Sequence, residues 1–324
     1  MATWLMTGAR GFLGRHLLAA LFAELEARGA TANRVILLGR QRPEGWPEQA
    51  FATVDLDNPD ALRNAVEEIA PDHVVHAAGR TPPATDQEFY QANFWGTLRL
   101  LNALRSLRRP VRVTVTGSAA ELGPVPAHLL PISESVECNP TTAYGRSKWL
   151  ATLAALAERS PLEVNVARLF NLVGPGLPAS QALGCFADQL AAGGGGPLPI
   201  VVGDLDARRD FLDVRDAARA LVVLNLQGAA GRVYHVGSGE SRPVREGLET
   251  LIRLSRREVR ICVDPARIDR GLPKDSRADI ARMVREIGWS PTVPFEKSVE
   301  DLWNERIERL RPPIAPSRAL PLTA

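Results

Sequence analysis

The stretch that decides the fold is Thr7-Gly8-Ala9-Arg10-Gly11-Phe12-Leu13-Gly14. A short apolar run, residues 3–6, precedes it, and apolar residues then recur at helical spacing through residues 13–28. Glycines at a strand–helix junction allow a tight turn, a close approach of backbone to a pyrophosphate and close packing of helix on strand. The stretch therefore predicts a dinucleotide-binding loop, and a purely structural turn is the alternative.

Outward from this loop, the first half of the chain alternates short aliphatic runs with segments of helical periodicity. The expected strands cover residues 3–6, 35–38, 74–77, 111–115, 164–169 and 233–236, and the expected helices cover residues 13–28, 59–69 and 89–107. Such alternation is typical of an α/β fold with a Rossmann-type, doubly wound parallel sheet and helices on both faces.

The composition changes near Gly174, where prolines surround the glycine run at residues 193–196 and predict a loop. We expect residues 1–173 to form the dinucleotide-binding domain, with strands returning around residues 205–240. Residues 174–311 are expected to form mostly a smaller substrate-binding lobe over the C-terminal edge of the sheet. The proline-rich residues 312–324 lack apolar periodicity and predict a loose tail.

The composition of the 324-residue chain also argues against several classes of function. A formal net charge of +2 predicts no nucleic-acid partner. Cys138, Cys185 and Cys262 are odd in number and lack CxxC spacing, so we expect no disulfide framework, no metal site and a reducing, cytoplasmic location. No apolar run approaches the roughly 18 to 20 residues of a membrane span, and the early glycine motif leaves no room for a signal peptide.

The end of the expected second strand bears on the choice of cofactor. NAD-binding folds place a carboxylate there to hold the ribose 2′-hydroxyl, but this strand ends in Gly39-Arg40. Arg40 and Arg10 can together bind a 2′-phosphate, so the sequence favours NADP, with NAD and two solvated arginines as the alternative. Asp55-Leu56 ends the third strand and is placed either to meet the adenine or to cap the following helix before Pro59.

Tyr144 and Lys148 are four residues apart and are therefore neighbours on one helical face. A nearby ammonium and an oxidised nicotinamide both lower the pKa of a phenol, which is ordinarily about 10. Ser118 follows the strand at residues 111–115 and can hydrogen-bond the same substrate oxygen. A YxxxK pair alone is common on surface helices, but after a dinucleotide loop it predicts a catalytic group of Ser118, Tyr144 and Lys148.

Together these motifs resemble the extended short-chain dehydrogenase/reductase family, also called the NAD-dependent epimerase/dehydratase family, along almost the whole chain. Further matching stretches are His76-Ala77-Ala78, Asn93 with Gly96-Thr97, and Arg168-Leu169-Phe170-Asn171. The second half is most similar to members that reduce GDP-4-keto-6-deoxy-mannose, and the similarity lies in residues 170–176, 202–205, 209–216, 233–239, 264–267 and 288–289.

The resemblance implies a nucleotide-sugar substrate and a homodimer in which two helices of each subunit form a four-helix bundle. It implies that Asn171 and Arg209 contact the sugar-nucleotide phosphates and that Arg267 or Arg270 does likewise, with solvated arginines as the alternative. His76 is expected to be structural, and Asn93 to fix backbone or water in its helix. The cofactor-binding residues are expected to be Gly8, Arg10, Gly11, Phe12, Leu13, Gly14, Arg40, Asp55, Leu56, Ala77, Ala78, Gly79, Tyr144 and Lys148.

Two departures from the family pattern bear on the reaction. The family's 4,6-dehydratases carry Asp-Glu where this chain has Ala119-Ala120, so dehydration, which needs an acid and a base, is disfavoured. Leu122-Gly123, preceded by Glu121, replaces the Tyr-Gly of many members, and this departure bears on which substrate is bound. The interpretation is an NADPH-dependent reductase of a 4-keto sugar nucleotide. A sugar-nucleotide 4-epimerase with tightly held NAD and a non-catalytic NAD(P)-sensing binding protein are the alternatives.

Overall fold

The computed structural model describes residues 2–30, 33–193, 197–268 and 273–310. Three features singled out in the sequence fall wholly or partly outside the described residues: Arg270, positions 194–196 of the glycine run, and the predicted tail at 312–324. Among the described residues, no helix is long and apolar enough to cross a membrane.

A seven-stranded parallel sheet forms the centre of the molecule, with the strand order β11-β6-β5-β4-β1-β2-β3. Its strands are β1 (Thr3–Thr7), β2 (Arg34–Gly39), β3 (Phe51–Thr53), β4 (His73–His76), β5 (Val111–Ser118), β6 (Leu162–Leu169) and β11 (Val233–Val236). The order runs outward in opposite directions from β1 and β4, which makes their carboxyl ends the topological switch point where such sheets bind ligands. The predicted Rossmann-type fold is therefore confirmed.

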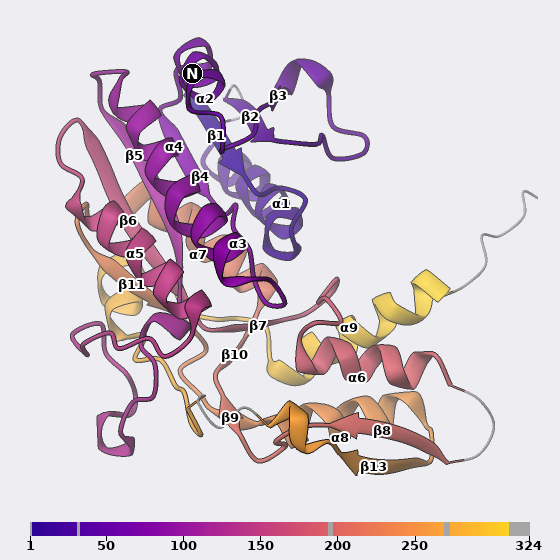
Figure 1. Ribbon diagram of the computed structural model, residues 1–324. Helices are drawn as coiled ribbons and strands as arrows, with labels where there is room; N and C mark the ends of the chain where they lie inside the picture. The colour runs from indigo at the N-terminus through magenta and orange to yellow at the C-terminus, as the bar shows by residue number, and fades with distance from the viewer. Residues whose placement is uncertain (1, 31–32, 194–196, 269–272, 311–324) are drawn as a thin grey trace, which may run out of the picture.

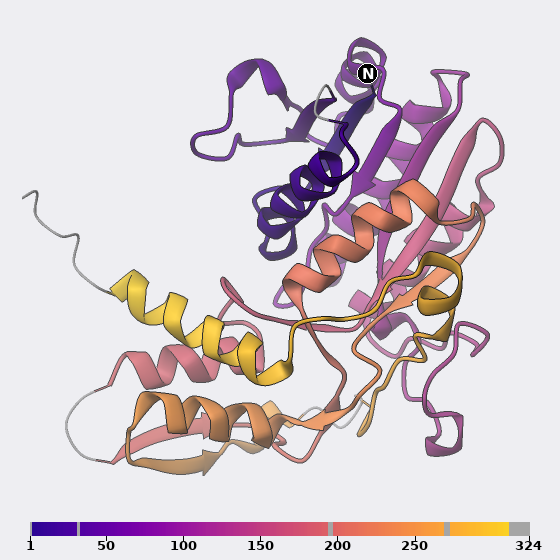
Figure 2. The same ribbon diagram turned by 180° about the vertical axis from the view of Figure 1, so that it is seen from behind.

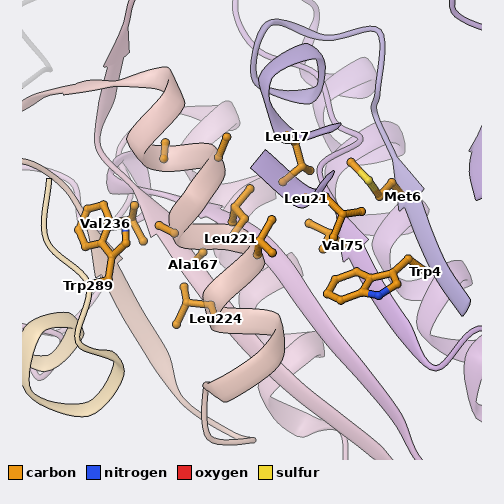
Figure 3. Packing of buried hydrophobic residues seen from close by; sticks show 14 of the residues in the cluster. Trp4, Met6, Leu17, Leu21, Val75, Ala167, Leu221, Leu224, Val236 and Trp289 are labelled. Atoms are coloured by element: carbon orange, nitrogen blue, oxygen red, sulfur yellow. The ribbon is translucent and has the colours of Figure 1, made fainter. Parts of the chain in front are cut away.

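Helices cover both faces of this sheet. α1 (Phe12–Ala27) and α7 (Val214–Gln227) pack on one face, and α2 (Pro59–Ile69), α4 (Gly96–Arg105) and α5 (Ala143–Ala157) pack on the other (Figures 1 and 2). Because successive strand side chains point to opposite faces, Trp4 and Met6 join the cluster beneath α1 and α7, whereas Leu5 joins the cluster beneath α2 and α4. Figure 3 shows the first cluster, with Leu221 of α7 among its members.

The segment expected as one helix over residues 89–107 is divided in the structure. α3 (Asp86–Phe89) passes into a π-helical turn, η2 (Tyr90–Trp95), before α4 begins at Gly96. Such expanded turns are frequent at functional sites. Buried Asn93 lies in this turn, accepts a hydrogen bond from the Arg80 amide at 2.7 Å and donates to the Arg80 carbonyl at 3.0 Å. These contacts agree with the expectation that Asn93 fixes backbone.

Most of the second half of the chain packs around a separate hydrophobic cluster that includes Leu183, Phe186, Ile200, Leu248 and Val299. The helices and strands concerned are β7 (Asn171–Val173), α6 (Ala182–Ala191), β8 (Leu198–Val202), β9 (Arg208–Arg209), β10 (Phe211–Asp213), β12 (Arg242–Pro243), α8 (Val244–Ser255), β13 (Val259–Val263) and α9 (Phe295–Leu310). The strands form three pairs, β7 with β10, β8 with β13 and β9 with β12. Between them, α7 and β11 return to the central sheet (Figure 1).

The remaining short elements are the 3-10 turns η1 (Glu48–Ala50), η3 (Ala119–Glu121), η4 (Ala127–Leu129) and η5 (Pro265–Arg267), and the π-turn η6 (Met283–Ile287). The N-terminal end of α1 joins the two parts of the molecule. Phe12 packs against the hydrophobic cluster of the second half of the chain, which includes Leu183 and Phe186. The ring of His16 donates to the carbonyl oxygen of Pro175 at 2.9 Å. A residue of the glycine loop thus contacts the opposite lobe.

Candidate active site

The glycine loop has the geometry of a phosphate cradle. Gly8 has φ +79°, and a Cβ there would lie 2.5 Å from the carbonyl carbon of Ala77. A Cβ at Gly14 would lie 2.1 Å from the Gly8 oxygen, so both positions require glycine. α1 begins at Phe12 with no side chain capping it, which leaves its first amides available to an anion. These features fit the pyrophosphate of a dinucleotide.

A buried hydrogen-bond chain supports this loop from beneath. The Ala78 amide donates to Thr7 Oγ1 at 3.2 Å, Thr7 Oγ1 contacts His76 Nδ1 at 2.7 Å, and His76 Nε2 contacts Thr97 Oγ1 at 3.0 Å. The Thr97 hydroxyl donates to the Asn93 carbonyl at 2.6 Å, so we assign the imidazole proton to Nε2. Burial, with Lys148 nearby, lowers the pKa of His76 to about 3, and the ring is neutral. His76 therefore has the contacts of a structural residue.

The end of β2 is open where an NAD-binding fold would have its carboxylate. A Cβ at Gly39 would meet nothing within 4 Å, and Arg40 is exposed beside it. Arg10 of the glycine loop donates to the side-chain oxygen of Gln41. Arg10 thus contacts the residue next to Arg40, which places the glycine loop against the segment that follows β2.

Asp55 and Leu56 follow β3. Asp55 Oδ1 accepts a hydrogen bond from the Asp57 amide at 3.1 Å, whereas Asn58 caps α2 by accepting from the Ala61 amide at 3.0 Å. The helix-cap alternative for Asp55 is therefore wrong, because the capping side chain belongs to Asn58. Leu56 approaches Gly96 at the start of α4.

Ser118, Tyr144 and Lys148 meet at the carboxyl end of β5. The side chain of Thr142 accepts from the Gly145 amide at 3.0 Å and begins α5, which presents Tyr144 and Lys148 to the strand. The Tyr144 phenol is hydrogen-bonded to Ser118, and the Lys148 ammonium donates to the Thr116 carbonyl. Burial lowers the pKa of Lys148 to about 8, against the opposing effect of Glu121. Residues from two elements, 26 and 30 positions apart in the chain, thus form one polar group.

The pKa of Tyr144 departs from the direction that the sequence suggested. Burial raises the pKa of the phenol, the hydrogen bond with Ser118 lowers it, and the charge of Glu121 raises it, so that the pKa lies above its ordinary value. The lowering of the pKa that the Tyr–Lys spacing suggested is not what the folded protein shows, because burial penalises the phenolate. Tyr144 is therefore protonated at neutral pH.

Sequence reasoning missed the buried ion pair behind Ser118. Glu121 is completely buried, its Oε1 accepts from the Ser118 amide at 2.7 Å, and its Oε2 accepts from Arg168 Nε at 3.0 Å. The local half of this arrangement has a recognisable signal, because Ser-Ala-Ala-Glu is a capping-box pattern and the structure forms that box. The distant half, Arg168 on β6, has no comparable signal.

A cavity of about 950 Å³ is lined mostly by residues of the second lobe. Asn171, Arg209 and Arg267 line it together, as do Pro82 and Pro83 from the loop after β4. Ser118, Tyr144 and Lys148 are not among its described lining residues, and Arg270 lies outside the described part of the chain.

The positions of the cavity arginines are set by backbone carbonyls. Arg209 donates to the Pro273 oxygen at 2.8 Å, and Arg267 donates to the Val201 oxygen at 3.2 Å. Sequence reasoning missed Lys274 and Cys185, which also line the cavity and carried no motif. With Lys274, three cationic side chains from separate segments line one cavity, which suits a phosphorylated ligand.

The chain is similar to proteins of known activity along nearly its full length. GDP-6-deoxy-D-mannose reductase of Pseudomonas aeruginosa is 33% identical over 94% of this chain and 97% of its own. A dTDP-6-deoxy-L-talose 4-dehydrogenase (NAD(P)(+)) of Kitasatospora kifunensis is 31% identical over 91% of this chain and 93% of its own.

The fold agrees with these likenesses. The structure of RMD from Pseudomonas aeruginosa complexed with NADPH superposes with a TM-score of 0.80 at 31% identity, covering 95% of this chain and 100% of that one. The family model of the NAD dependent epimerase/dehydratase family matches residues 4–237, which include the glycine loop, Ser118 and the Tyr144–Lys148 pair. The chain belongs to the NAD dependent epimerase/dehydratase family.

Proposed function

We propose that this protein is an NADPH-dependent reductase of a nucleotide-linked 4-keto sugar, similar to GDP-4-keto-6-deoxy-mannose. The observation that carries the proposal is the polar group of Ser118, Tyr144 and Lys148, in which the phenol is protonated and hydrogen-bonded to the serine. A protonated phenol suits the reductive direction, because a carbonyl must gain a proton as it is reduced. The two relatives named above, a reductase and a 4-dehydrogenase of nucleotide sugars, support the same class of reaction.

The cofactor would be held by the glycine loop and the strand ends around it. Gly8, Gly11 and Gly14, with Phe12 and Leu13, would hold the pyrophosphate, and Ala77, Ala78 and Gly79 would flank the nicotinamide half. Arg10 and Arg40 would bind the 2′-phosphate, with Asp55 and Leu56 near the adenine. The absence of a carboxylate at Gly39 and the NADPH of the related structure support NADP over NAD.

Each member of the polar group has one task in carbonyl reduction. NADPH, when bound, supplies the hydride for the carbonyl carbon. Tyr144 donates its phenolic proton to the carbonyl oxygen. The Ala120 amide donates to Ser118 Oγ at 3.2 Å, and the serine hydroxyl would donate its own proton to that same carbonyl oxygen. Lys148 would hold the nicotinamide ribose, and its ammonium stabilises the phenolate that remains after proton transfer.

The nucleotide sugar would lie in the cavity that the second lobe mostly lines. Asn171, Arg209 and Arg267 are offered as its phosphate ligands, with Lys274 as an addition from the structure and Arg270 as the remaining candidate. We propose on this basis that residues 174–311 serve mostly to bind substrate and residues 1–173 to bind the cofactor.

We further propose a cytoplasmic homodimer. Trp95, just before α4, is 44% exposed, and Leu150 and Leu153 on α5 are 36% and 43% exposed. Large apolar side chains gathered on two adjacent helices support a helix-bundle interface between two copies of this chain. The three cysteines are free thiols, which suits a reducing compartment.

Nicotinamide absorbance tests the reaction directly. We expect one NADPH to be oxidised for each GDP-4-keto-6-deoxy-mannose added, and a 4-hydroxy sugar nucleotide to be released. The control is Tyr144→Phe, which should bind NADPH almost normally yet lose at least roughly a hundredfold in turnover, the scale of a positioned proton donor. If the protein instead interconverts C4 epimers and leaves NADPH unoxidised, the reductase proposal is rejected in favour of a 4-epimerase. Turnover of UDP or dTDP sugars alone would change only the base.

A further inference from the structure

We propose that Glu121 is a positioning residue for the carbonyl chemistry, because its buried carboxylate holds the backbone of Ser118 and places a fixed negative charge beside Tyr144 and Lys148. The inference rests on the proposed function, which assigns the reaction to these three residues. In the sequence, Glu121 is notable only as the residue before Leu122-Gly123. Its role follows from what the folded chain brings around it.

The carboxylate reaches Ser118 through a turn built for it. Ser118 and Glu121 form a reciprocal capping box around η3, in which Glu121 Oε1 accepts from the Ser118 amide at 2.7 Å and Ser118 Oγ accepts from the Ala120 amide at 3.2 Å. A Cβ at Gly117 would lie 2.6 Å from Glu121 Oε1, so glycine at this position leaves the space that the carboxylate occupies. Both the backbone and the hydroxyl of Ser118 are thereby oriented by one short turn.

Arg168 donates to the other carboxylate oxygen of Glu121, and its remaining guanidinium nitrogens also have partners. It is directly opposite Gly117 in the β5–β6 register, and its Nε donates to Glu121 Oε2 at 3.0 Å. A second guanidinium nitrogen contacts His235 Nε2 at 3.2 Å, and a third donates to Cys138 Sγ at 3.2 Å. His235 Nδ1 meets the Ile132 carbonyl at 3.0 Å, so we assign the ring proton to Nδ1 and leave Nε2 to accept from Arg168.

Burial raises the pKa of Glu121, and Arg168, the Ser118 amide and Lys148 oppose that effect. Both carboxylate oxygens accept from N–H donors, which is the pattern of an ionised carboxylate. The charged and titratable groups around it are Arg168 on β6, Lys148 and Tyr144 on α5, His235 on β11, and Cys138 in the preceding loop. Burial and Arg168 lower the pKa of His235 to about 3, and burial raises the pKa of Cys138, so these two groups are neutral. Glu121 thus offsets two buried cations, Arg168 and Lys148.

Net stability alone does not account for the buried Glu121–Arg168 pair behind Ser118. Buried ion pairs contribute little net stability, because desolvation of the two charges offsets their attraction. Burial raises the pKa of Tyr144 and lowers that of Lys148, and the negative charge of Glu121 adds to the first shift and opposes the second. The pair therefore affects the two ionisable groups of the proposed mechanism.

Tyrosinate absorbance tests the charge without requiring a substrate. The difference between the protein and its Tyr144→Phe variant isolates the titration of Tyr144, and the same difference is measured in the Glu121→Gln background. We expect the midpoint in Glu121→Gln to move by about one pH unit towards lower pH, the scale of one nearby charge. Glu121→Asp, which keeps the charge, should leave the midpoint near that of the wild type.

Kinetics supply the second readout. In Glu121→Gln the pH at which the reverse reaction with NADP becomes active should shift in the same direction, and kcat should fall by roughly tenfold or more through a displaced Ser118. The KM for NADPH should stay within about twofold, because the glycine loop is untouched. The matched control is Glu158→Gln, which removes a buried carboxylate paired with Arg105 at the far end of α5 and should leave the Tyr144 midpoint unchanged.

If Glu121→Gln fails to fold, the double variant Glu121→Gln/Arg168→Gln takes its place, because it removes both members of the buried Glu121–Arg168 pair and leaves neither of them alone. It should show the same shift in the Tyr144 midpoint. An unmoved midpoint in a folded variant overturns the inference and leaves Glu121 a structural residue. A shifted midpoint in a protein that reduces no nucleotide sugar keeps the inference about Tyr144 and rejects the proposed substrate.

Discussion

At the residue scale, the lack of a side chain at Gly39 bears on which cofactor the protein prefers. A Cβ there would meet nothing within 4 Å, so the space for a ribose-binding carboxylate exists and is left empty, while Arg40 stands exposed beside it. Nothing in the packing of β2 requires glycine at this position. The simplest physical account is a site that accepts the larger and negatively charged 2′-phosphate.

Replacing Arg40 tests this account. Arg40→Asp should weaken NADPH binding by roughly ten- to a hundredfold, the worth of a charge-assisted hydrogen bond, and NADH binding much less. Fluorescence titration of both cofactors measures it. The control is Arg42→Asp, which makes the same charge change in the same loop, where Arg42 instead donates to the Trp46 carbonyl at 2.6 Å. Equal losses for the two cofactors, or a wild-type preference for NADH, would reject the assignment.

At the scale of elements, α4 and α5 contribute both to the core and to an exposed apolar surface. Their inner faces close the core of the central sheet, and α5 also presents Tyr144 and Lys148 to β5. Exposed apolar side chains lie just before α4, at Trp95, and on α5, at Leu150 and Leu153. If two copies pair through these helices, dimer formation supports the same helix that holds the catalytic pair.

Sedimentation or light scattering tests the pairing. Leu153→Glu should shift the proposed dimer to monomer, because it places a charge in the centre of an apolar contact. The matched control is Val263→Glu on β13, which is 59% exposed on a different element and should leave the assembly unchanged. A wild-type monomer, or a dimer that survives Leu153→Glu, would show that the interface lies elsewhere or does not exist.

At the scale of the whole molecule, two buried histidines make the stability depend on pH. Burial lowers the pKa of both His76 and His235 to about 3, whereas an unfolded histidine titrates near 6.5. Between about pH 6.5 and pH 3 these two histidines bind protons in the unfolded chain but not in the folded chain. Their contribution to stability is therefore fully present above about pH 6.5 and is lost as the pH falls towards about 3.

Urea unfolding between pH 7 and pH 4 measures this loss. Each of the two histidines should contribute a slope of about 1.4 kcal/mol per pH unit below about pH 6. His235→Asn should lose one such contribution, and the exposed His128→Asn should not change the slope. An unchanged slope in His235→Asn would mean that this imidazole is accessible to protons in the folded protein.

Some features of the protein followed from short stretches of sequence. The six expected strands depend on periodicity within a few residues and are confirmed, most of them one to three residues longer than expected. The glycine stretch forms the predicted turn between β1 and α1. The continuous helix over residues 89–107 was wrong in detail, because the π-turn at Tyr90–Trp95 is set by the contacts of Asn93 with Arg80 and with Ser147 on α5.

Other features exist only in the folded chain. The pKa of Tyr144 is raised because packing buries the phenol and brings Glu121 near it, an effect that the Tyr–Lys spacing cannot reveal. Arg168 meets Glu121 across 47 positions, and Asn171, Arg209, Arg267 and Lys274 share one cavity although most are far apart in sequence. Local patterns determined the strands, the loop and the candidate residues, because backbone preferences act over a few residues. The charges and distances that decide their chemistry came from tertiary packing, because electrostatic interactions depend on separation in space and on burial.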